Sequence, residues 1–297
     1  MDGVDLIAWA EGNRPLLDEL LTKHGAILFR GFDLAGVSDF ERLVGVVSGD
    51  LLDYTYRSTP RTLVSGRIYT STEYPADQFI PLHNELSYAT SWPMKVWFWC
   101  MQSASRGGET PIADSRVILG GIHPDVVERF ARCGVMYVRN YGEGLDLPWK
   151  DVFQTTSKAE VEKMCIEAKL DFEWKSGDRL RTRQICQGIA THPKTGSRVW
   201  FNQANLFHVS RLKPAVRDLL SAFPEEDLPR NAYYGDGSPI DAATVDHIED
   251  VYRERAVVFT WARGDVLLLD NMLTAHGRRP FEGQRKVVVG MAEMIDS

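Results

Sequence analysis

Strand-like segments lie near the start, in the middle and at the end of the chain, with helical segments between them, and this order constrains the fold most. Residues 94–101 are dense in aromatic and β-branched side chains, which are typical of a buried strand. Shorter apolar strands are expected at residues 26–29, 266–269 and 286–291. A βαβ repeat would instead alternate strands and helices along the whole length. The order therefore predicts a mainly β protein with an antiparallel core and helical decoration.

Helices are expected where apolar side chains recur with helical spacing. Leucines recur in this way over residues 14–24, and Gly25 follows as a candidate C-cap. Further helices are expected at residues 38–47, 124–133, 158–169, 214–223 and 242–252. Further strands are expected at residues 188–191 and 197–202, which form a hairpin, and at 256–261. Because repeats and linker-like tracts are lacking, the simplest organisation is a single domain over residues 1–297 with a helical insertion around 115–180.

Composition excludes several classes of function. The 297 residues are 44% hydrophobic and 25% charged, which is ordinary for a folded domain. The net charge is −7 and no basic stripe occurs, so a nucleic-acid partner is not expected. No apolar run approaches the roughly 18 residues that a membrane span needs, and no signal peptide is recognisable. The four cysteines are scattered without metal-type spacing, which favours structural thiols and a cytoplasmic location.

The triplet His83-Asn84-Glu85 is the first candidate for chemistry. In extended backbone, residues two apart point to the same side, so an imidazole and a carboxylate can address one point. With one distant histidine they would form a facial triad, which leaves adjacent positions open on an iron(II) ion. An H-x-E triplet alone is a weak signal, because such pairs occur often by chance.

A second block supplies the distant histidine. An apolar strand ends in Asp270-Asn271, His276 follows, and Arg285 stands at the start of the next strand. A planar guanidinium can bind a carboxylate through two parallel hydrogen bonds, as a dicarboxylate co-substrate requires.

With these motifs in order, the chain resembles the TauD/TfdA-like family of iron(II)/2-oxoglutarate oxygenases, which includes taurine dioxygenase and the clavaminate-synthase-like proteins. The likeness spans nearly the whole chain. Its motifs are residues 25–32, His83-x-Glu85, residues 107–110 and residues 264–285. The resemblance implies a double-stranded β-helix (jelly-roll) core and a reaction that uses Fe(II), 2-oxoglutarate and O2. It also implies that His83, Glu85 and His276 bind iron, and that Thr110 and Arg285 bind 2-oxoglutarate.

One position departs from the common pattern of the family. Most relatives have aspartate as the second ligand, whereas this chain has Glu85, whose extra methylene moves the carboxylate by about 1.5 Å. Clavaminate-synthase-like relatives accept glutamate there. Related halogenases lose this carboxylate to admit a halide, so its retention favours oxygen transfer over halogenation.

The reaction expected from the resemblance is oxidation of an unactivated C–H bond in a small molecule. The branch of the family suggests hydroxylation of an amino acid or an amino-acid-derived natural-product intermediate, and leaves open whether a carrier protein presents it. Desaturation or cyclisation would use the same cofactors. A non-catalytic binding protein on the same fold, and a cupin-like metal enzyme without 2-oxoglutarate, are the alternatives from other classes. A homo-oligomer also stays open.

The remaining polar residues allow two interpretations each. Asn202 and His208, in an aromatic and polar segment, are candidates for substrate contact, but a buried hydrogen-bond network would use the same residues. Arg278 and Arg279 could assist a carboxylate or be solvated. Structural roles are expected for His24, His123, His192 and His247 and for the core residues Trp97 and Trp99.

Overall fold

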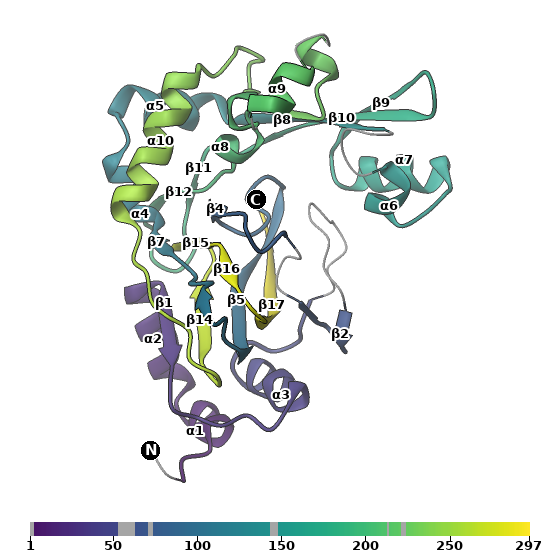
Figure 1. Cartoon of the computed structure of the whole chain (residues 1–297). Helices are drawn as coiled ribbons and strands as arrows, with labels where there is room; N and C mark the ends of the chain where they lie inside the picture. Colours follow the sequence, from purple (N-terminus) through teal and green to yellow (C-terminus); the bar gives the residue numbers. More distant parts are fainter. Residues whose placement is uncertain (1–2, 53–62, 71–73, 143–147, 213, 221–223) are drawn as a thin grey trace.

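A six-stranded antiparallel sheet forms the centre of the molecule (Figure 1). The computed structural model describes residues 3–52, 63–70, 74–142, 148–212, 214–220 and 224–297. The strands of this main sheet are, in spatial order, β1 (Ala26–Phe29), β14 (Val266–Asp270), β5 (Ser91–Gln102), β17 (Lys286–Asp296), β3 (Ile68–Thr70) and β2 (Leu63–Ser65). Except for β3 and β2, which follow each other in the chain, neighbours in this order are far apart in sequence, because the first and last parts of the chain pair with the middle.

A smaller sheet faces the main one. It contains β4 (Ile80–His83), β15 (Thr274–Arg278) and β7 (Ile112–Asp114), and β6 (Arg106–Gly107) pairs with β16 (Phe281–Glu282) beside it. The two sheets meet where Phe98 on β5 contacts His276 on β15, with ring centroids 5.0 Å apart. This arrangement confirms the expected mainly β fold with a jelly-roll core.

Strand β5 is buried on both faces, which explains its continuous apolar run. Trp97 and Trp99 point to one face, where they pack with residues of α1 (Leu6–Gly12), α2 (Arg14–His24) and α3 (Val37–Ser48). In Figure 1, α1 and α3 lie below the main sheet, and α2 lies at its left beside β1. Phe98 and Cys100 alternate with the tryptophans and point to the opposite face, toward the smaller sheet.

A second lobe surrounds the other end of the core. It contains a four-stranded sheet in the order β13 (Arg230–Tyr234), β8 (Val135–Tyr141), β10 (Arg179–Cys186) and β9 (Asp171–Lys175). Its helices are α4 (Ser115–Gly121), α5 (Pro124–Cys133), α6 (Trp149–Phe153), α7 (Lys158–Glu167), α8 (Ala204–Phe207), α9 (Pro214–Leu220) and α10 (Ala242–Arg255). Strands β11 (Ile189–Thr191) and β12 (Arg198–Trp200) form a hairpin, and His192 beside it contacts Asp270 at the end of β14 in the core. The range 115–180 thus holds β8 and β9 besides α4–α7, and its description as an insertion stays a prediction.

Most predicted elements are present with bounds that differ by a few residues, and one predicted strand is absent from the described residues. Residues 256–261 do not form a strand: Val257 makes only an isolated bridge to Ile112, and its side chain is 63% exposed. The predicted helix over 214–223 is α9, which ends at Leu220, and residues 221–223 lie outside the described part of the chain.

The cysteines behave as structural thiols in the described chain. All four are free, and three of them are buried. Burial raises the pKa of Cys100 and of Cys165 to about 11, and that of Cys186 to about 12, so these thiols stay protonated at neutral pH. Within the same described residues, every helix is too short or too polar to cross a membrane.

Candidate metal centre and co-substrate site

Two histidines and a glutamate converge between the sheets. The pairing of β4 with β15 places His83 directly opposite His276, and the ring centroids are 4.6 Å apart. The Glu85 Oε2 atom lies 3.9 Å from His276 Nε2. One ligand atom from each of the three residues lies within 4.8 Å of the others. Glu85 and His276 are buried, and His83 is half-buried. The sequence-predicted triad is therefore brought together in space.

The backbone of the triplet differs from the extended form expected of it. Strand β4 ends at His83, and Glu85 lies in a turn that continues through Leu86, whose φ is 55°. A left-handed conformation is strained for a leucine and is found mostly where the surroundings impose it. The Glu85 carboxylate reaches the histidines from this turn, not from a strand face.

The hydrogen bond of His83 fixes which ring nitrogen is available to a metal. Its Nδ1 lies 2.8 Å from the carbonyl oxygen of Pro81. Because a carbonyl oxygen only accepts, Nδ1 carries the proton and Nε2 keeps its lone pair. Two imidazoles and one carboxylate, with one imidazole oriented in this way, fit the donor set of a facial-triad iron(II) site.

Arg285 lies beside a glycine that permits a close backbone approach. Its Nε donates to the carbonyl oxygen of Gly108 over 3.0 Å. A Cβ on Gly108 would lie 3.0 Å from Arg285 Cδ and 3.1 Å from its Nε, and the φ of Gly108 is +74°. Burial, and secondly the charge of Arg278, lower the pKa of Arg285 to about 10. A half-buried cation of this kind gains from a bound carboxylate, which restores the charge interactions lost with water.

The neighbouring arginines are not equivalent to Arg285. Arg278 is buried and its guanidinium donates to the carbonyl oxygens of Tyr74, Pro75 and Gln78 at 2.6 to 2.9 Å. It therefore holds a loop of the main chain, a role that the sequence did not suggest. Arg279 is exposed, as the solvated interpretation had it.

Thr110 is buried, and its hydroxyl has a partner in Trp261. The indole Nε1 of Trp261 donates to Thr110 Oγ1 over 2.9 Å. Since this hydroxyl oxygen accepts from the indole, its own hydrogen is directed elsewhere and can be donated to another acceptor. A carboxylate oxygen is such an acceptor.

The chain is similar to known proteins over most of its length. The family model of the taurine catabolism dioxygenase TauD, TfdA family matches residues 1–291. The chain belongs to this family. It is 42% identical over 280 residues to the dapdiamide synthesis protein DdaC of Enterobacter agglomerans, covering 94% of this chain and 85% of the relative. It is also 34% identical over 288 residues to a clavaminate synthase-like protein of Arabidopsis thaliana, covering 93% of this chain and 84% of that protein.

A solved structure with the same fold is that of asparagine oxygenase in complex with Fe(II), hydroxyasparagine and succinate. The TM-score is 0.58 at 11% identity, over 96% of this chain and 79% of the other. This TauD/TfdA-family chain is a 2-oxoglutarate-dependent dioxygenase that uses Fe(II), 2-oxoglutarate and O2 to oxidise a small-molecule substrate.

If Thr110 binds 2-oxoglutarate, as the resemblance implies, Trp261→Phe is expected to raise the KM for 2-oxoglutarate by about 5-fold, because a hydrogen bond that orients Thr110 contributes about 1 kcal/mol. The change keeps the aromatic ring and removes only the indole donor, so kcat should stay near the wild-type value. Steady-state kinetics with 2-oxoglutarate as the varied substrate measures both constants. Trp99→Phe is the matched control, since this buried indole packs on the other face of the main sheet. An equal KM in both variants would contradict the role of Trp261.

The two substrate candidates are engaged within the protein. Asn202 Nδ2 donates to the carbonyl oxygen of Gly188, and its Oδ1 accepts from the backbone of Ala204. His208 Nε2 donates to the carbonyl oxygen of Ile240, and His208 Nδ1 accepts from the hydroxyl of Ser210. Burial lowers the pKa of His208, so the neutral ring is favoured. These bonds give both side chains a structural role, and a substrate contact would have to compete with them.

Proposed function

We propose that His83, Glu85 and His276 bind one iron(II) ion per chain, and that Arg285 and Thr110 bind the far carboxylate of 2-oxoglutarate. The observation that carries this assignment is the convergence of the three ligand atoms within 4.8 Å. The second part rests on two groups suited to an anion. One is the half-buried guanidinium of Arg285, whose pKa is lowered. The other is the hydroxyl of Thr110, which accepts from Trp261 and can donate its own hydrogen to a carboxylate.

The protein's own residues prepare this site. The carbonyl oxygen of Pro81 holds the His83 ring in one tautomer. Phe98 packs edge-on against His276 and keeps that side of the ring apolar and dry. The guanidinium of Arg285 can hold a carboxylate at a fixed angle, which orients the co-substrate toward the triad. Iron bound there would couple the conversion of 2-oxoglutarate into succinate and CO2 to oxidation of the substrate.

We propose further that the substrate is an amino acid or an amino-acid-derived natural-product intermediate, and that the reaction is hydroxylation of an aliphatic C–H bond. A relative with 42% identity is named for dapdiamide synthesis, which supports a natural-product role. Asparagine oxygenase, which shares the fold, was crystallised with a hydroxylated amino acid. The retained carboxylate of Glu85 favours oxygen transfer over halogenation.

Incubation of the enzyme with iron(II), 2-oxoglutarate and oxygen tests this substrate class. A panel of free and carrier-bound amino acids is supplied, and succinate formation and product mass are measured. We expect succinate to increase with at least one amino-acid substrate, whose product gains one oxygen atom. A product that has lost two hydrogen atoms would show desaturation or cyclisation instead. Turnover with sulfonates or simple carboxylic acids alone would refute the substrate class and leave the metal site standing.

A further inference from the structure

The turn that carries Glu85 is held by the side chain of Asn271. The Oδ1 atom of Asn271 accepts from the backbone N–H of Glu85 at 2.7 Å, and its Nδ2 donates to the carbonyl oxygen of Glu85 at 2.9 Å. The same Nδ2 donates to the carbonyl oxygen of Pro93 at 2.8 Å. Asn271 is fully buried. Its amide therefore takes the place of a partner strand for the backbone of a residue that β4 no longer includes.

Further bonds hold the residue before Glu85. Asn84 Nδ2 donates to the backbone oxygen of Asn271 at 2.6 Å and to Ser115 Oγ at 3.1 Å. Gln203 Nε2 donates to the backbone oxygen of Asn84 at 2.7 Å. The strained residue Leu86 directly follows Glu85. A strained backbone persists only where the surrounding contacts hold it from several sides, and the bonds of Asn84 and Asn271 are such contacts.

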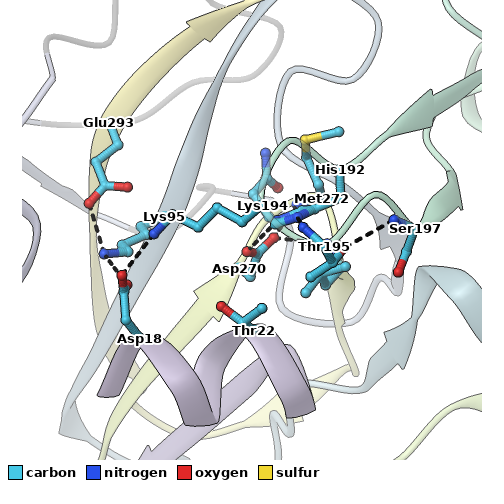
Figure 2. Close-up of polar contacts among 12 residues, drawn as sticks. Asp18, Thr22, Lys95, His192, Lys194, Thr195, Ser197, Asp270, Met272 and Glu293 are labelled. Carbon is cyan, nitrogen blue, oxygen red and sulfur yellow. Dashed lines mark hydrogen bonds and ion pairs between the residues drawn. The ribbon is translucent and has the colours of Figure 1, made fainter. Parts of the chain in front are cut away.

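A buried pair of charged and polar groups shapes the turn that begins at Asn271. Asp270 Oδ1 accepts from the backbone N–H groups of Met272 and Leu273, each at 3.0 Å. Its Oδ2 lies 2.9 Å from His192 Nε2, as Figure 2 shows. His192 is fully buried, and its Nδ1 accepts from the backbone N–H of Thr195 at 3.1 Å. The ring proton is therefore on Nε2 and is donated to Asp270.

We propose that Asn271 is a positioning residue for the Glu85 ligand, and that the His192–Asp270 pair fixes the turn that presents Asn271. This inference rests on the proposed metal site. Metal binding is stronger when a ligand is already oriented, because less conformational freedom is lost on binding. Asn271 contacts both the N–H and the carbonyl group of the Glu85 backbone. Loss of the Asn271 side chain should therefore loosen the backbone of the turn that carries Glu85, and not only the Glu85 side chain.

Cobalt(II) binding to the full chain tests the proposal, read from the visible spectrum of the protein-bound ion. We expect Asn271→Ala to raise the Kd for cobalt(II) by about 10- to 100-fold, the usual effect of removing a group that orients a metal ligand. Asn271→Asp keeps the acceptor for the Glu85 N–H but loses the donor to the Glu85 carbonyl group, so its Kd for cobalt(II) should also rise. His192→Phe acts through Asp270, and we expect a smaller loss of cobalt(II) affinity.

Asn231→Ala is the matched control. Asn231 is also buried; its Oδ1 accepts from Val209 and Ala232, and its Nδ2 donates to Glu225. Thermal unfolding of the metal-free proteins should show a loss of stability in both alanine variants, but only Asn271→Ala should lose cobalt affinity. If Asn271→Ala does not fold, Asn271→Asp carries the comparison with the control.

Two outcomes separate the inference from the site on which it rests. His83→Ala that binds cobalt(II) as tightly as the wild type would overturn the metal site itself. Loss of binding in His83→Ala, together with Asn271 variants that bind as tightly as Asn231→Ala, would overturn only the positioning role of Asn271.

Discussion

Replacement of either His83 or His276 with alanine is expected to abolish both iron retention and substrate turnover. The two rings face each other across the β4–β15 pair, so each supplies a nitrogen that no other described residue can supply from the same place. With one imidazole removed, two protein ligands remain, too few to hold a divalent ion that must keep its other positions for co-substrate and oxygen. Iron content after anaerobic loading and gel filtration, and succinate formation, are the two measurements.

His247→Ala is the control for these variants. This histidine stacks on His123 in the helical lobe, and its Nε2 accepts from the backbone N–H of His123. The variant should bind iron and turn over like the wild type. Full activity in His83→Ala or in His276→Ala would show that the triad is not the metal site.

The sequence was most informative where one physical requirement acts on a residue. Both faces of strand β5 pack against apolar side chains, so nearly all of its residues must be apolar, and its composition alone predicts a buried strand. The strands of the four-stranded sheet β13-β8-β10-β9 were not predicted, because several requirements act on their residues at once. In β10, Arg181 and Thr182 are polar side chains that are nevertheless buried. Arg181 can be buried because it forms ion pairs with Glu226 and Asp227 from a distant segment. Such pairing is decided by the tertiary structure and leaves no local pattern.

The same contrast holds at the site. The types and order of His83, Glu85 and His276 are visible in the sequence, because ligand chemistry restricts them to few residue types. Their supports are not. The run containing Asp270 and Asn271 was noticeable, but nothing local shows that Asn271 binds the backbone of Glu85, a residue far away along the chain. Trp261 was visible only as a possible strand residue, although its indole donates to Thr110.

Arg285→Ala is expected to raise the KM for 2-oxoglutarate by about 10- to 100-fold or more, because breaking a buried charge pair on one side costs several kcal/mol. Iron binding should be retained, since the triad is untouched. Arg279→Ala, which removes an exposed guanidinium close in sequence, should leave the KM near the wild-type value. An unchanged KM in Arg285→Ala would show that another cation binds the co-substrate.

Arg285→Lys separates the charge of this residue from its shape. Lysine keeps a positive charge but loses the two-pronged guanidinium and the Nε that donates to Gly108, so its KM should lie between those of the wild type and Arg285→Ala. The lowered pKa of Arg285 adds a dependence on pH. The free enzyme carries the charge below about pH 10 and loses it as the pH rises through that value, so wild-type affinity for 2-oxoglutarate should fall there. Arg285→Ala has no such charge to lose, and its weak affinity should not change over the same pH range. Binding measured by competition with a non-reactive 2-oxoglutarate analogue at increasing pH distinguishes the two curves, and parallel curves would contradict the assignment of Arg285.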